Sequence, residues 1–200
     1  MATPVPDPDF SSDTGSDTGS DTELIDAIRR GDAAAFTQLM CTYVDPLRRF
    51  AYSLVEDVAS ADDVVQDVFA AIWMTRSKWK PTHGARTYLF GAVRNRLLDV
   101  GRHLSVRKNA QPVLAESLAY AAAQRDGDPT SQIEHRQDVA ALQRAVRELT
   151  ERRRTALRLR YVEQMTVPEI ARVMNVSPKA AEQLVWQATH AIRAALERTR

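Results

Sequence analysis

Residues 60–74 show the clearest helical pattern in the chain. Apolar side chains recur there at spacings of three and four residues, as one face of an amphipathic helix requires: Val64, Val65, Val68, Phe69, Ile72 and Trp73. Asp63, Gln66 and Asp67 fall on the other face, and Ser60 is the predicted N-cap. Two aspartates one turn apart repel each other at a cost of roughly 0.2–0.5 kcal/mol. An acidic face that lowers helix stability indicates a surface kept for a basic protein partner.

A basic helix is predicted over residues 86–103, after a loop over residues 77–85. At 100° per residue its buried side is Leu89, Val93, Leu97 and Val100, and its opposite side is Tyr88, Gly91, Asn95, Asp99 and Arg102. Gly91 costs about 1 kcal/mol relative to Ala inside a helix. A glycine at this position is compatible with two alternatives. Another backbone could approach α-helical residue 91 closely, or the helix could simply pack against a neighbouring helix.

The N-terminal part begins with a tail that cannot form a core. Residues 1–21 carry aspartates, prolines and repeated SDT units, and we expect them to be disordered. This tail either shields basic surfaces or is inert. A first helix is predicted over 22–30 and a second over 33–44, with Asp45-Pro46 breaking or kinking the chain before 47–54 continues.

The C-terminal part has a helix-turn-helix pattern. A linker at 104–137 is rich in breakers, and an Arg-rich helix is predicted over 151–162. Thr166 and Glu169 form a T-x-x-E capping box, and Asn175 suits the left-handed residue that ends a helix. Ser177 and Pro178 are suited to begin the next helix.

The predicted fold is all-α, with two small helical domains joined by a flexible linker. The expected boundaries are 1–21 for the tail, 22–103 and 138–200 for the domains, and 104–137 for the linker. A hydrophobic content of 44 % is sufficient for cores. Cys41 is the single cysteine of the chain, which excludes an internal disulfide, and the apolar run around it favours a buried thiol. The chain has no run of 18 apolar residues, so we expect it to be soluble and cytoplasmic, without membrane insertion.

Charge is segregated although the net charge is only +1. Residues 56–75 hold acids without Lys or Arg, whereas basic residues predominate in 76–103 and again in 138–200. This pattern indicates one surface for a basic protein and others for a polyanion. The sequence lacks histidines at metal-ligand spacing, a Gly-rich phosphate loop and a set of catalytic residues. We therefore expect no enzyme activity, no cofactor, no metal and no small-molecule substrate.

Two aromatic residues leave alternatives open. Trp79, in the basic loop, could stack with Tyr88 on single-stranded bases or belong to the core. Trp186, on the predicted recognition helix, could pack on a neighbouring helix or contact DNA. The helix-turn-helix could also serve protein contact only. The arginines of 152–160 and Arg172 would supply phosphate contacts.

The order and spacing of these residues resemble the extracytoplasmic-function (ECF, group 4) sigma factors of the sigma-70 family. The resemblance rests on Gly31, Asp32 and Phe36; on Asp62, Asp63, Gln66, Asp67, Phe69 and Trp73; on Tyr88, Leu89, Arg94, Asn95, Asp99 and Arg102; and on Leu149, Arg153, Tyr161, Thr166, Glu169, Ile170, Ala171 and Ser177. It implies a sigma region 2 helical bundle and a sigma region 4 helix-turn-helix.

The resemblance also implies the partners and their sites. RNA polymerase core, through its β′ clamp helices, would bind Asp62, Asp63, Gln66, Asp67, Phe69 and Trp73. The −10 element of promoter DNA would bind Trp79, Lys80, Arg86, Tyr88, Arg94, Asn95 and Arg102. The −35 element would bind Arg172, Ser177, Lys179, Ala180, Gln183, Trp186 and Gln187. The helix-turn-helix would also bind the β flap of the polymerase. Many members of the family are held by an anti-sigma factor.

The implied function is to direct the polymerase core to specific promoters and to begin promoter opening. The alternative is a stand-alone helix-turn-helix regulator whose residues 22–103 form a dimerisation or ligand domain. Such a regulator would bind duplex DNA without polymerase, as a dimer on a palindrome.

Overall fold

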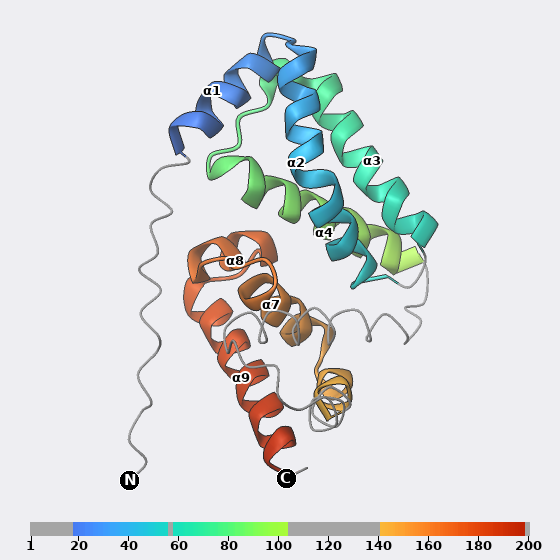
Figure 1. Cartoon of the computed structure of the whole chain (residues 1–200), viewed down its shortest axis with the longest axis vertical. Helices are drawn as coiled ribbons and strands as arrows, with labels where there is room; N and C mark the ends of the chain where they lie inside the picture. The colour runs from blue at the N-terminus through green and yellow to red at the C-terminus, as the bar shows by residue number, and fades with distance from the viewer. Residues whose placement is uncertain (1–17, 56–57, 104–140, 199–200) are drawn as a thin grey trace, which may run out of the picture.

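The computed structural model describes residues 18–55, 58–103 and 141–198, and its regular elements in these ranges are all helices (Figure 1). They are α1 (Thr18–Arg29), α2 (Ala33–Tyr52), α3 (Val58–Thr75), the 3-10 helix η1 (Arg76–Lys78), α4 (Gly84–His103), α7 (Glu151–Tyr161), α8 (Val167–Met174) and α9 (Pro178–Glu197). Residues 141–148 are also helical. The all-α prediction is confirmed for these ranges, and the linker over 104–137 lies outside them.

Helix α2 runs unbroken through Pro46, so the predicted break is wrong. Asp32 caps its start, because its carboxylate accepts the backbone N–H groups of Ala34 and Ala35. A proline inside a helix removes one backbone hydrogen bond and crowds the preceding turn, which lowers the stability of the helix by about 3 kcal/mol. Leu39, Leu47 and Phe50 are fully buried on either side of it, and their packing holds the helix together.

Two helix starts differ from the sequence prediction. Helix α1 begins at Thr18, so residues 18–21 are helical rather than part of a disordered tail, while residues 1–17 lie outside the described part. The Asp21 carboxylate accepts the backbone N–H of Ala85 at 3.2 Å, and it thereby caps the start of α4 from a distant segment. Helix α3 begins at Val58, so Ser60 lies inside the helix and is not its cap.

Helices α1–α4 form the N-terminal bundle, whose core includes Leu39, Phe50, Phe69, Ile72 and Leu89. The rings of Phe50 and Phe90 lie 5.1 Å apart and join α2 to α4. Cys41 is exposed, contrary to the prediction of a buried thiol. Two residues advance a helix by about 200°, so Cys41 faces away from the core side that holds Leu39.

Helices α7–α9 form the C-terminal bundle and contain the predicted helix-turn-helix. The Glu169 carboxylate accepts the Thr166 backbone N–H at 2.8 Å, as a capping box requires. Asn175 has φ 52° and ψ 55°, the left-handed conformation. Ser177 accepts the backbone N–H of Ala180 at 3.2 Å at the start of α9. These three local predictions are confirmed.

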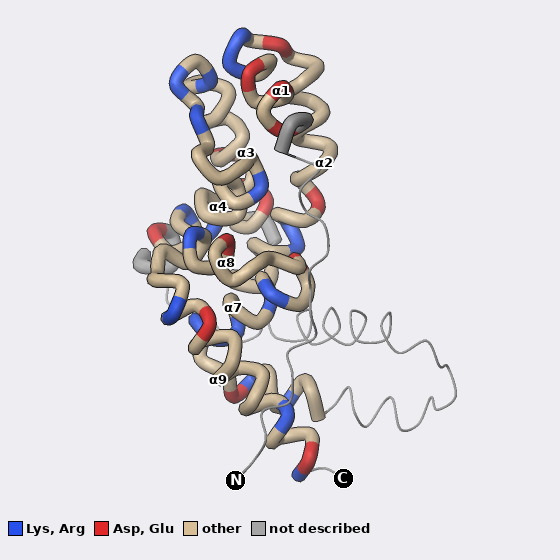
Figure 2. The backbone as a smooth tube through the Cα atoms, turned by 90° about the vertical axis from the view of Figure 1, so that its left-hand side faces the viewer, with Lys and Arg blue, Asp and Glu red and all other residues tan. Residues whose placement is uncertain are grey.

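The two bundles pack directly on each other. Helix α8 lies beneath α4 in both views of the chain (Figures 1 and 2). One continuous hydrophobic cluster joins residues of both bundles, among them Phe90 and Val93 of α4 and Ile170 and Val173 of α8. The sequence pattern did not predict this contact.

Candidate functional site

The acidic face of α3 is partly neutralised by bases from other helices. Asp62 pairs with Arg48 of α2 at 2.8 Å, and Asp67 pairs with Arg96 of α4 at 2.9 Å. Residues 58–75 of α3 contain no Lys or Arg, so both bases come from other helices, which the sequence pattern of α3 alone does not reveal. Asp63 and Gln66 remain exposed.

Two of the predicted polymerase-contact residues turn inward. Phe69 is buried in the bundle core, because it lies on the apolar side of α3. Trp73 is partly buried: its ring lies 4.9 Å from that of Phe36, and the Arg76 guanidinium covers it at 4.5 Å. Among the predicted polymerase-contact residues, the polar ones therefore remain at the surface of α3: Asp63, Gln66 and Asp67 are exposed, and Asp62 is partly exposed.

A groove of about 450 Å³ lies between α3 and α4. Its lining includes Asp67, Ala71, Met74, Ala92 and Arg96. Met74 is 81 % exposed, the most exposed of the large hydrophobic side chains in the described ranges. Methionine is enriched at protein interfaces relative to the rest of a protein surface, so an exposed Met74 in a groove is compatible with a protein-binding surface.

Trp79 is a core residue and not a free stacking platform. It is only 4 % exposed, and its ring meets Tyr88 edge-on at 5.8 Å. The described residues provide no hydrogen-bond acceptor for its indole N–H. Tyr88 is 43 % exposed and is the aromatic ring that reaches solvent on this side of α4.

The other predicted −10 residues differ in accessibility. Lys80 and Asn95 are exposed, and the side chain of Arg102 lies outside the described part. The Arg86 guanidinium donates to the backbone carbonyl of Glu163 in the C-terminal bundle. Arg94 is buried, and burial lowers its pKa, while nearby Glu151 opposes that shift.

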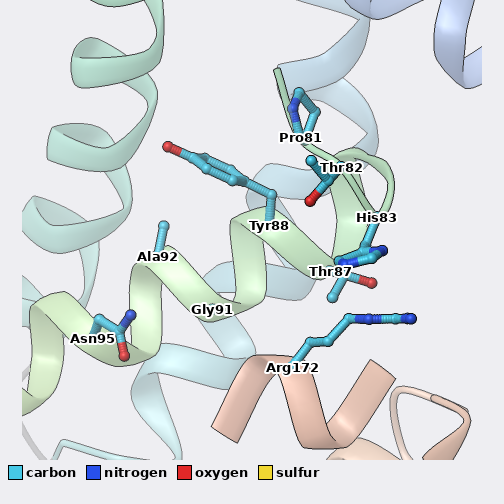
Figure 3. Close-up of a pocket in the computed structure, with 9 residues that line it drawn as sticks. All are labelled: Pro81, Thr82, His83, Thr87, Tyr88, Gly91, Ala92, Asn95 and Arg172. Carbon is cyan, nitrogen blue, oxygen red and sulfur yellow. The ribbon is translucent and has the colours of Figure 1, made fainter. Parts of the chain in front are cut away.

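A pocket of about 320 Å³ opens where α4 meets α8 (Figure 3). Tyr88, Gly91 and Asn95 of α4 line it together with His83 of the preceding loop and Arg172 of α8. Figure 3 shows Arg172 extending from α8 toward His83 and Thr87. The structure therefore brings a residue predicted for the −35 element into the site predicted for the −10 element.

Most arginines of helix α7 make contacts within the protein. The helix therefore does not present a row of arginines that are free to bind phosphate. Arg158 is 1 % exposed and pairs with buried Glu163 at 3.3 Å. Arg154 donates to the Leu149 carbonyl, and Arg160 donates to the Met165 carbonyl. Arg152 remains exposed. Residues 155–159 of α7 are all buried, so packing on all sides encloses Arg158, whereas its charge alone had suggested a surface position.

Burial acts against both charges of the Arg158–Glu163 pair. Desolvation raises the pKa of Glu163, although Arg158, Arg86 and Arg49 oppose that shift. Desolvation also lowers the pKa of Arg158. Sequence analysis missed this pair, because nothing in the local pattern marks Glu163 as buried.

The recognition helix α9 presents a polar face with one aromatic stack. Trp186 is 63 % exposed, so it does not pack on a neighbouring helix; it stacks on His190 at 5.2 Å with rings 2° from parallel. Lys179 and Gln183 are exposed, Ala180 is partly exposed, and the Ser177 hydroxyl is occupied as the helix cap. Gln187 accepts a hydrogen bond from Arg153 of α7 at 3.1 Å.

Comparison with known proteins places both bundles in one family. Residues 39–110 match the family model described as sigma-70 region 2, and residues 140–188 match the one described as sigma-70, region 4. The RNA polymerase sigma factor CnrH of Cupriavidus metallidurans is 29 % identical over 170 residues, covering 84 % of this chain and 89 % of that protein. The ECF RNA polymerase sigma factor RpoE of Cereibacter sphaeroides is 28 % identical over 150 residues, covering 74 % of this chain and 79 % of the relative.

The chain belongs to the ECF sigma factors of the sigma-70 family. This sigma factor directs RNA polymerase to promoters, and the stand-alone regulator is not favoured. Its fold is also similar to CnrH solved in complex with the cytosolic domain of CnrY, with a TM-score of 0.63, 25 % identity and coverage of 90 % of this chain and 98 % of that one.

Two features are absent from the described ranges of the chain. None of the sigma factor's helices there is long and apolar enough to span a membrane. Within the same ranges, side chains of His, Cys, Asp and Glu do not gather in any group of three or more that could hold a metal ion.

Proposed function

We propose a division of labour within the sigma factor in which the outer face of α3 binds the polymerase core, α4 opens the −10 element, and α9 reads the −35 element. The observation that carries it is that one bundle exposes both sets of residues, Asp63 and Gln66 on α3 and Tyr88 and Asn95 on α4. One rigid bundle can thus hold the enzyme with one face and a DNA strand with another. The β′ clamp helices are the expected contact of α3.

The −10 interaction would use Tyr88 as the stacking ring, Asn95 for a base edge and Lys80 for phosphate. Stacking of a base on an aromatic side chain contributes about 1–3 kcal/mol. Separating one base-pair step costs about 1.4 kcal/mol on average. Capture of one or two extruded bases would therefore offset the opening of a few base pairs without ATP. Trp79 supports Tyr88 from the core in this scheme.

The −35 interaction would use the outward face of α9. Lys179, Gln183, Trp186 and Gln187 lie on the first three turns, which enter the major groove in helix-turn-helix proteins. Arg152 is the exposed arginine of α7 available for phosphate. This bundle would also contact the β flap.

A protein inhibitor would suit the groove between α3 and α4. The solved CnrH structure contains the cytosolic domain of CnrY, and a structure from Bartonella quintana holds the sigma factor RpoE with the anti-sigma factor NepR. For this chain we propose an anti-sigma segment that places an apolar side chain near Met74 and competes with the polymerase. The sigma factor would act in the cytoplasm, where the polymerase works.

Run-off transcription tests the proposed function. Purified protein and core polymerase are mixed with fragmented DNA from the source organism, and the start sites are mapped. Promoter-dependent transcripts and co-elution with core are expected. Absence of both would overturn the proposal, and a gel shift of intact duplex by the protein alone would favour a stand-alone regulator.

A further inference from the structure

Helix α1 lies along the segment that connects α3 to α4, and it contacts this segment at both of its ends (Figure 1). The segment consists of η1 and residues 79–83, among them the exposed Lys80. Just after the end of α1, a Cβ atom built on Gly31 would lie 3.5 Å from Nε of Arg76 in η1. Near the start of α1, Asp21 meets the first turn of α4. Helix α1 therefore spans a segment that we assign to the −10 element.

The contact at the end of α1 involves an arginine that is itself fixed on α3. The Arg76 guanidinium donates to the Trp73 carbonyl at 2.8 Å and covers the Trp73 ring at 4.5 Å. That ring in turn lies 4.9 Å from the ring of Phe36 on α2. The first end of the connecting segment is therefore anchored to three helices.

The start of α4 receives its cap from α1. His83 precedes the helix and is not among the residues preferred for capping, and the first turn of α4 holds no acid. Asp21 supplies the acceptor from 64 residues away: its Oδ2 atom accepts the backbone N–H of Ala85 at 3.2 Å. A Cβ atom built on Gly84 would lie only 3.3 Å from the same oxygen, so a glycine there leaves room for the carboxylate. Such a carboxylate satisfies an unpaired N–H group and opposes the positive end of the helix dipole.

The capped turn belongs to one wall of the pocket at the proposed −10 site. Ala85 is fully buried, whereas Tyr88, one turn later, is exposed and lines the pocket. Pro81 and Thr82, which precede the cap, line the same pocket (Figure 3). Helix ends fray when their N–H groups lack partners. Loss of the cap would therefore loosen the loop and the turn of Tyr88, while the bundle core keeps its contacts.

We propose that α1 is a brace for the −10 site and that Asp21 is its positioning residue. Asp21 does not touch DNA in this scheme. Its hydrogen bond holds the loop before α4 and the turn that carries Tyr88 in one geometry before the strand arrives. Binding then costs less entropy, because the site does not have to be ordered at that moment. The proposal rests on the proposed role of α4 in binding the −10 strand.

Hydrogen–deuterium exchange of the full-length protein tests the brace without any DNA. Asp21→Ala removes the acceptor, Asp21→Asn keeps an acceptor oxygen, and Glu23→Ala removes an exposed acid of α1 two residues away. We expect Asp21→Ala to speed exchange in peptides covering 79–88 by about two- to thirtyfold, the range that corresponds to the loss of a helix cap. Peptides from α2 should keep their wild-type rates, as should all peptides of the other two variants. Unchanged exchange over 79–88 in Asp21→Ala would overturn the proposal.

Strand binding by the holoenzyme tests what the brace does for function. The probe is a single-stranded oligonucleotide with the −10 sequence mapped by run-off transcription. Holoenzyme with Asp21→Ala should bind it about tenfold more weakly than wild type, whereas Asp21→Asn and Glu23→Ala should bind it nearly as wild type does. All three variants should co-elute with core polymerase, because the outer face of α3 is unchanged. Equal losses in Asp21→Ala and Asp21→Asn, or in Asp21→Ala and Glu23→Ala, would overturn the role of this hydrogen bond.

The outcomes separate this proposal from the proposed function. Faster exchange in Asp21→Ala together with wild-type strand binding would overturn the positioning role, even if run-off transcription succeeds. Faster exchange together with failed run-off transcription by the wild-type protein would instead overturn the proposed function and leave the brace standing. Circular dichroism and the exchange of α2 show that the variants are folded in each case.

Discussion

The Nε–H of Arg153 on α7 donates a hydrogen bond of 3.1 Å to Oε1 of Gln187 on the recognition helix α9. Arginine has only donors, so the amide oxygen of Gln187 must face it and the amide nitrogen must face away. Gln187 would therefore offer a donor to the major groove. The matching acceptors there are N7 and O6 of guanine, N7 of adenine and O4 of thymine.

Arg153→Ala should relax base preference at one −35 position, because the Gln187 amide can then turn over. One hydrogen bond corresponds to about 0.5–1.5 kcal/mol of discrimination. Transcription from a promoter library randomised in the −35 element measures this preference. Arg152→Ala is the matched control: it removes the same charge from an exposed neighbour and should weaken all sequences alike. Identical sequence profiles for the two variants would contradict the positioning role.

Asp63→Arg should weaken binding to core polymerase without lowering the stability of the fold. Asp63 is exposed on α3, whereas its neighbours Asp62 and Asp67 are already paired with arginines. Co-elution with core and a urea titration measure the two effects. Asp45→Arg is the control, since Asp45 is an exposed acid on α2. Unchanged core binding by Asp63→Arg would show that α3 is not the docking surface.

Trp79→Ala and Tyr88→Ala should separate stability from promoter opening. Removal of the buried Trp79 ring should cost about 3–5 kcal/mol of unfolding free energy. Removal of the exposed Tyr88 ring should leave the thermal midpoint nearly unchanged while reducing open-complex formation. Thermal unfolding and permanganate footprinting of the holoenzyme measure these effects. Open DNA at wild-type level with Tyr88→Ala would argue against base stacking by this residue.

Replacing the buried ion pair by apolar residues should stabilise the protein. Arg158→Met combined with Glu163→Leu removes two desolvated charges and should raise the free energy of unfolding by about 1–4 kcal/mol. Arg158→Met alone leaves Glu163 buried without its partner. This single variant should lower the free energy of unfolding by about 3–5 kcal/mol. Denaturant titration measures both variants. Equal stability of the single and double variants would contradict this account of the pair.

The stability advantage of that double variant should shrink as the pH falls from 7 toward 5. Burial raises the pKa of Glu163 in the folded state, so the folded protein holds this proton more tightly than the unfolded chain does. Its contribution to stability is therefore fully present below the unfolded pKa and is lost as the pH rises through the folded pKa. Urea titrations of wild type and double variant at several pH values measure the difference. A gap that widens toward acid pH would contradict the direction of the shift.

The sequence determined the helices and most of their ends, because these depend on interactions within a few residues. The apolar spacing of Val65, Phe69 and Ile72, the Thr166–Glu169 cap and the left-handed Asn175 were all predictable in this way. Prediction failed at Pro46, where packing outweighed local preference and the proline lies inside a continuous helix. It also failed at Cys41, because an apolar run was taken as evidence of burial although helix geometry turns Cys41 away from Leu39.

The tertiary structure alone decided which functional side chains are accessible. Trp79 and Tyr88 are equally plausible stacking residues in the sequence, but packing buries the first and exposes the second. The charges of Arg48 and Arg96 reach the acids of α3 only because three helices meet. The position of α8 against α4 depends on contacts between segments far apart in the chain, and local periodicity carries no information about such contacts.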